Sequence, residues 1–141
     1  MEGERKAGRS VVLDANPSSV LDFESFAEGL DFLSPVERHR VMIAGGEILD
    51  NLIREASPMD RRKLRVRVTR RRGSVLLAFY FRSPGFAAFS AGSLEFEPLF
   101  DHLDRRWRGL GLLMCRNLAR RIAFRPGELL DRIFLEFDRQ L

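Results

Sequence analysis

Apolar residues follow two different periods along this chain, and the first half opens with a strand and a helix. Residues 10–13 (SVVL) are a short β-branched run that predicts a strand. Residues 14–18 (DANPS) supply turn and helix-start chemistry, with Asn16 as the cap. Apolar side chains at helical spacing then predict a helix over residues 17–30.

A second helix is predicted over residues 35–56, with Ser34 as its N-cap and Glu37 in the acidic first turn. Gly45 and Gly46 interrupt it, and each glycine costs about 1 kcal/mol relative to alanine inside a helix. A close approach of another element to the backbone would explain them, and packing of the helix on a strand is the simplest form of that approach.

The second half of the chain is dominated by strand patterns. Strict alternation sets Leu64, Val66 and Val68 against Arg65, Arg67 and Arg70, which predicts a strand with one buried and one wet face. A turn at 71–74 leads into the apolar run 75–81 (VLLAFYF), read as a central strand.

The rest of the chain is divided between a loop, a helix and a last hairpin. Residues 83–93 predict a mobile loop, and residues 98–108 weakly indicate a short helix. A third helix is predicted over residues 112–122. Residues 122–124 and 130–137 predict two strands that form a closing hairpin. The fold class that follows is α+β: a two-layer sandwich with a mainly antiparallel mixed sheet and about three helices on one face. Residues 1–141 form one domain, in which residues 1–9 are expected to be a flexible N-terminal segment.

Composition indicates the class of protein to which this domain belongs and the compartment in which it is expected. The chain is 45% hydrophobic and 31% charged, as expected for a globular protein. Its one cysteine, Cys115, excludes an intrachain disulfide framework and fits a reducing cytoplasm. Cys115 is read as a small core residue, and His39 and His102 have no sequence-local metal partners. The sequence shows neither a signal peptide nor a membrane span, so a cytoplasmic location is expected.

Positive charge gathers at residues 61–72 and 105–108, although the formal net charge is only +4. Such patches can bind nucleic acid, phosphates or an acidic protein, and most often they are solvated surface. The arginine-bearing face of the strand at 64–70 carries no interleaved aromatic residues of its own. Nucleic-acid binding is therefore the least favoured class on the sequence alone.

Three short motifs could carry chemistry. Glu47 and Asn51 lie four residues apart on the second helix and so project from one face. The second motif, residues 83–86 (SPGF) with Gly85, follows the central strand directly. The third, residues 108–112 (RGLGL), opens the third helix. Each motif alone is common.

In this order and on these elements, the three motifs resemble the N box and the two glycine boxes of the histidine-kinase-like (GHKL or Bergerat) ATPases. The short chain is most similar to the anti-sigma-factor serine kinases within that superfamily, and the resemblance covers residues 10–137.

The resemblance implies specific roles. Asn51 would hold the Mg²⁺ that bridges the phosphates of ATP, and Glu47 would be the general base. Gly109 and Gly111, with Gly85 in the first box, would bind the nucleotide through backbone N–H groups, which suit phosphate oxygens at a helix start. Arg108 would add positive charge there, and residues 86–107 would correspond to the ATP lid.

One departure from the family pattern concerns adenine. The family has an aspartate at the end of the central strand, where it accepts a hydrogen bond from the adenine amine, and Phe81 holds that position here. An unpaired amine costs about 1–3 kcal/mol, a tenfold to hundredfold loss of affinity. Glu55 also replaces a histidine usual in the family.

Two functions follow from the resemblance. The first is an anti-sigma-factor-like regulatory protein that binds a sigma factor or an antagonist protein, with impaired or lost ATP binding. The second is an active ATP-dependent serine/threonine-protein kinase that acts as an anti-sigma factor. The resemblance also implies a homodimer, and it leaves open whether the chain is an enzyme.

Overall fold

The computed structural model describes residues 7–55, 63–82, 99–101, 106–108, 115–125, 127 and 130–139. The elements follow the order β1 (Ala7–Asp14), α1 (Ser19–Glu28), α2 (Pro35–Glu55), β2 (Lys63–Arg70), β3 (Ser74–Phe81), β4 (Leu99–Asp101), β5 (Arg106–Arg108), β6 (Arg121–Arg125) and β7 (Asp131–Asp138).

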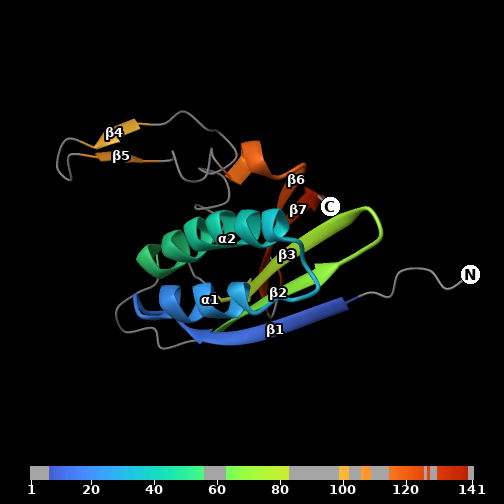
Figure 1. Ribbon diagram of the computed structural model, residues 1–141. Coiled ribbons are helices and arrows are strands. Elements are labelled where there is room, and N and C mark those ends of the chain that lie inside the picture. Colours follow the sequence, from blue (N-terminus) through green and yellow to red (C-terminus); the bar gives the residue numbers. More distant parts are fainter. Residues whose placement is uncertain are drawn as a thin grey trace, which may run out of the picture.

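Five strands form one sheet in the order β1-β2-β3-β7-β6, and β3 lies at its centre. Helices α1 and α2 cover one face of this sheet (Figure 1), and a helical turn at residues 115–118 packs beside α2. The α+β class and the two-layer arrangement with helices on one face are therefore confirmed. Every pairing between the described strands is antiparallel, so the parallel part of the predicted mixed sheet is not found among them.

The start of α1 differs from the predicted start by two residues. Ser18, not Asn16, is the N-cap, and the helix begins at Ser19. The Asn16 side chain instead accepts a hydrogen bond from the Ser18 backbone N–H at 3.1 Å, which closes a turn ahead of the helix. The preceding strand, β1, begins at Ala7, three residues before the predicted Ser10, so residues 7–9 belong to the sheet.

Helix α2 begins with the predicted cap in full. The Ser34 backbone N–H donates to Glu37 Oε1 at 2.8 Å, and the Glu37 N–H donates to Ser34 Oγ at 3.2 Å, which is a reciprocal capping box. Glu37 is 2% exposed and forms an ion pair with Arg139 Nε at 3.0 Å. This pair fixes the start of α2 to the residue that follows β7.

The two glycines of α2 have different surroundings. A Cβ atom on Gly45 would lie 2.2 Å from Cζ of Phe23 on α1, whereas a Cβ on Gly46 would meet nothing within 4 Å. Gly45 therefore lets α1 and α2 approach each other closely. The sequence predicted that a strand approaches α2 at this glycine, and that prediction is wrong because the element that approaches is the helix α1. The structure gives no steric reason for a glycine at position 46.

The core lies between the helices and the inner face of the sheet. It is built from alternate residues of the strands of the five-stranded sheet, including Leu64, Val66 and Val68 on β2. Arg70, predicted for the wet face, has the core-facing phase of β2, and its Nη1 donates to the Phe32 carbonyl at 3.0 Å. This hydrogen bond holds the Arg70 guanidinium on the helix side of the sheet, beside the segment that joins α1 to α2.

Two predictions for the second half of the chain were wrong. The weakly indicated helix at 98–108 is a small antiparallel pair, β4 with β5. The third helix was predicted to reach Ile122, but Ile122 lies in β6 and the described helical residues are 115–118. The predicted loop at 83–93 lies outside the described residues.

Candidate functional site

The middle of α2 carries Glu47 and Asn51, the two residues that the sequence predicts for an N box. Asn51 and Glu47 are both partly exposed, and the Asn51 amide nitrogen donates to the Glu47 backbone carbonyl at 2.7 Å. This bond uses the donor end of the amide and fixes the group on the helix. The amide oxygen, which is the end that can bind a cation, points away from that carbonyl.

The helical turn that follows the second glycine motif packs against this part of α2. Cys115, at its start, is buried and donates a hydrogen bond from Sγ to the Ala44 carbonyl at 3.4 Å. Burial raises the pKa of the Cys115 thiol to about 12, and the negative charge of Glu47 adds to this effect. The thiol therefore stays protonated at neutral pH, as expected for a core cysteine, and the Glu47 carboxylate lies within electrostatic range of the turn.

The other end of the candidate site is the last residue of β3. Phe81 is 4% exposed and belongs to the hydrophobic core. Its ring offers no hydrogen-bond acceptor, and its burial shows that this position serves packing. Asn51 has an amide oxygen of the kind that can bind a cation, whereas Phe81 offers nothing that could accept a hydrogen bond from an adenine amine.

A carboxylate that the sequence reading missed lies directly across from Phe81. Asp131 begins β7 and pairs with Phe81, so both side chains are on the core face of the sheet. Asp131 is 9% exposed, and its Oδ1 accepts a hydrogen bond from the Gly127 backbone N–H at 3.3 Å. The signal in the sequence is one acid in the apolar phase of β7, which continues with Ile133, Leu135 and Phe137.

The remaining predicted site residues cannot be placed beside these. Gly85, Gly109 and Gly111 lie outside the described residues, as does most of the predicted lid. Arg108 ends β5, where it pairs with Leu99. Within the described residues, no group of three or more histidine, cysteine, aspartate or glutamate side chains could hold a metal ion.

No family model matches this chain, and no curated protein matches it either. In the parts of the chain that the structure describes, no helix has the length and apolarity required to cross a membrane.

Proposed function

We propose that this chain is an anti-sigma-factor-like regulatory protein that binds a partner protein through a histidine-kinase-like ATPase fold, with ATP binding impaired or lost. The observation that carries the proposal is the burial of Phe81 in the core at the end of β3. A purine amine at this position would lose a hydrogen bond, at a cost of about 1–3 kcal/mol.

The relation to that ATPase class is supported by the helix layer and by α2. The layer packs on one face of the sheet (Figure 1), and α2 holds Glu47 and Asn51 one turn apart. The turn at 115–118 lies against the same part of α2, through Cys115 and Ala44. In this proposal, the retained fold presents a surface to a sigma factor or to an antagonist protein, and the molecule acts as a homodimer.

A second candidate, an active ATP-dependent serine/threonine-protein kinase, is favoured by Asp131. Cross-strand neighbours have Cα atoms about 5 Å apart, so the Asp131 carboxylate is one strand away from the position where the family has its aspartate. In this candidate Asp131 would receive the adenine amine. Asn51 would hold Mg²⁺ with the phosphates, and Glu47 would be the base that faces the attacking hydroxyl.

A thermal-shift titration with Mg-ATP and Mg-ADP separates the two candidates. A ligand at 100 times its Kd adds about 2.7 kcal/mol of stability. We expect millimolar nucleotide to leave the melting temperature unchanged. A clear shift that Asn51→Ala and Asp131→Leu abolish, but Asp131→Asn retains because the amide still offers an oxygen, would favour the kinase.

Restoring the carboxylate at position 81 tests the proposal from the other side. In Phe81→Asp/Asp131→Asn the acceptor returns and a second adjacent negative charge is avoided. We expect this variant to gain a shift with Mg-ATP. If it folds, as judged by circular dichroism, and gains none, the assignment of Phe81 to the adenine position is wrong.

Partner binding needs its own measurement. Purified sigma factors and antagonist proteins of the anti-sigma class are mixed with the chain, and complexes are measured by light scattering with and without Mg-ATP. We expect a complex of equal affinity in both conditions, unaffected by Asn51→Ala. Failure of every such protein to bind would overturn the proposed function, and a requirement for Mg-ATP would favour the kinase.

A further inference from the structure

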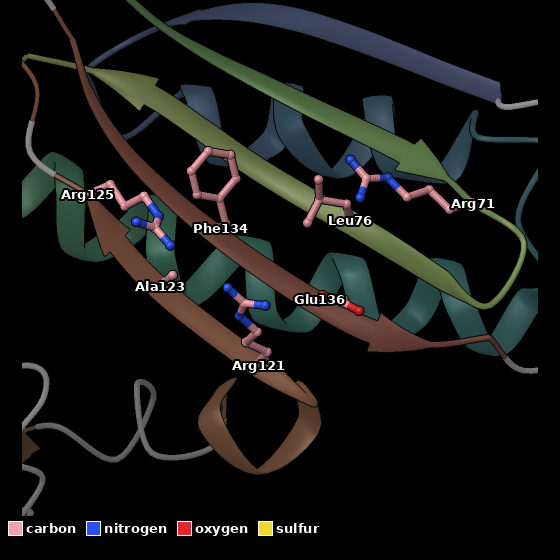
Figure 2. A pocket seen from close by; sticks show the side chains of 7 residues that line it. All are labelled: Arg71, Leu76, Arg121, Ala123, Arg125, Phe134 and Glu136. Atoms are coloured by element: carbon pink, nitrogen blue, oxygen red, sulfur yellow. The ribbon is translucent and has the colours of Figure 1, made fainter.

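The face of the sheet opposite the helices combines basic and aromatic side chains that come from different strands. In the antiparallel register, alternate residues of β2, β3, β7 and β6 lie side by side on it. We call this surface the open face because α1 and α2 lie on the other side of the sheet (Figure 2). Its members are Lys63, Arg65, Arg67, Thr69, Arg71, Leu76, Ala78, Tyr80, Arg121, Ala123, Arg125, Arg132, Phe134 and Glu136.

Two aromatic rings lie near the middle of the open face. Tyr80 on β3 and Phe134 on β7 are partly exposed and meet edge to face, with ring centroids 6.2 Å apart and planes at 90°. The Arg132 guanidinium lies over the Phe134 ring, 6.0 Å from its centroid. Partly exposed rings bordered by cations are the chemistry on which unpaired nucleobases stack.

Arginines surround these rings. The open face carries seven basic side chains, and the acids on the same side of the sheet are Asp14, Glu136 and Asp138. Arg120 binds two of these acids, pairing with Asp138 at 2.7 Å and with Glu136. Among the residues that the structure describes, none of the six arginines on the open face takes part in an ion pair. Their charge is therefore available to an anionic ligand.

A pocket lies on the open face across β3, β7 and β6, with Arg71 of the β2–β3 turn at one side. Its lining brings together Arg71, Arg121, Arg125, Leu76, Ala123, Phe134 and Glu136. Figure 2 shows the three guanidinium groups around the apolar centre that Leu76 and Phe134 form. Guanidinium groups beside an apolar floor suit a phosphate that is linked to a base.

We propose that the open face binds single-stranded nucleic acid, with bases stacked on Tyr80 and Phe134 and phosphates held by the surrounding arginines. Only unpaired bases expose the ring faces that such stacking needs. A second copy of the chain is disfavoured because it would bring two arginine-rich faces together. This site is independent of the proposed function, which rests on the other face of the sheet.

The strand that contains Arg65 and Arg67 has no aromatic residue on its wet face, and its sequence alone therefore disfavours nucleic acid. The structure supplies the rings from neighbouring strands: Tyr80 pairs with Arg65, and also with Arg132 on its other side. Aromatic rings and cations thus alternate from strand to strand across the sheet. The sequence of any one strand does not show this alternation.

Fluorescence anisotropy with labelled single-stranded RNA and DNA of mixed sequence tests the site, at salt from about 50 to 200 mM. We expect saturable binding whose log K falls with log salt. Arg67→Gln and Arg125→Gln should each reduce that slope by roughly 0.7 to 1. Arg116→Gln, at an exposed position in the helical turn beside α2, is the matched control and should leave both affinity and slope unchanged.

The aromatic part of the site has a separate pair of variants. Tyr80→Leu should weaken binding about tenfold without changing the salt slope, because stacking is lost and no phosphate contact is. Tyr80→Phe retains the ring and should bind as the unchanged protein does. Should Tyr80→Leu not fold, the arginine variants still decide the question, since those side chains are exposed.

Four outcomes would overturn the site. The first is no saturable binding at the lowest salt, and the second is binding that the open-face variants leave unchanged. The third is competition by polyglutamate as effective as by an oligonucleotide of equal charge, which would indicate an acidic protein partner. The fourth is that duplex DNA binds as tightly as single strands and that Tyr80→Leu does not change the affinity. That result would indicate a surface that binds phosphates alone, without base stacking.

Discussion

The two faces of one sheet place neighbouring residues of the same strand in opposite environments. On β3, Leu77 is fully buried beneath the helices, whereas Leu76 is partly exposed on the open face. On β2, Val66 and Val68 belong to the core while Arg65 and Arg67 are exposed. The comparison separates two tasks: the covered face supplies most of the stability, and the open face can change its chemistry at little cost to folding.

The largest expected effect tests that separation at adjacent leucines. Leu77→Ala should lower the free energy of unfolding by about 2–5 kcal/mol, because it leaves a cavity in the core. Leu76→Ala should cost about 1 kcal/mol or less. Urea denaturation of the two variants provides the measurement. Equal losses would contradict the comparison and would mean that another surface covers the open face.

A smaller contrast is expected within the helix layer. Gly45→Ala should destabilise the protein by about 1–3 kcal/mol, since the new methyl group would collide with the Phe23 ring. Gly46→Ala has open space and should stabilise it by about 0.5–1 kcal/mol. Opposite shifts of the urea midpoint would support this contact, whereas shifts in the same direction would contradict it.

The smallest expected effect concerns the pH dependence of the covered side. The pKa of Cys115 is raised from its ordinary value of 9.0 to about 12, so the folded state retains the thiol proton that the unfolded chain releases. This contribution to stability is complete below pH 9.0 and is lost as the pH rises towards about 12.

Denaturation profiles of the unchanged protein and of Cys115→Ala measure this contribution. In that pH range the variant should lose stability less steeply. Glu47→Gln should lower the pKa of Cys115, because it removes a nearby negative charge. A thiol that reacts with a soluble disulfide reagent at neutral pH in the folded protein would contradict its burial.

Much of the fold could be predicted from local signals. The alternation of Leu64, Val66 and Val68 with Arg65 and Arg67 in β2 is a local signal, and so is the Ser34 cap of α2; both appear in the structure as expected. The end of the third helix could not be predicted, because Ile122 fits an apolar helix as well as a strand and its pairing with Leu135 decides the matter. Arg70 and Gly45 were misread because their partners, Phe32 and Phe23, lie far away in the sequence.

The candidate sites divide in the same way. Glu47 and Asn51 share a helix face because of their spacing, so the sequence alone could place them together. Asp131 becomes a neighbour of Phe81 only through the register of β3 with β7. The association of Tyr80 and Phe134 with arginines likewise depends on strand pairing, which periodicity within one strand does not encode.

The ion pair between Glu37 and Arg139 has a consequence for the order in which the protein forms. The two residues are 102 positions apart, yet Glu37 belongs to the capping box at the start of α2. While the chain is being synthesised, α2 emerges long before Arg139, so the buried carboxylate first lacks this partner. Docking of α2 should therefore be completed only after the segment that contains β7 and Arg139 has been made, about a hundred residues later.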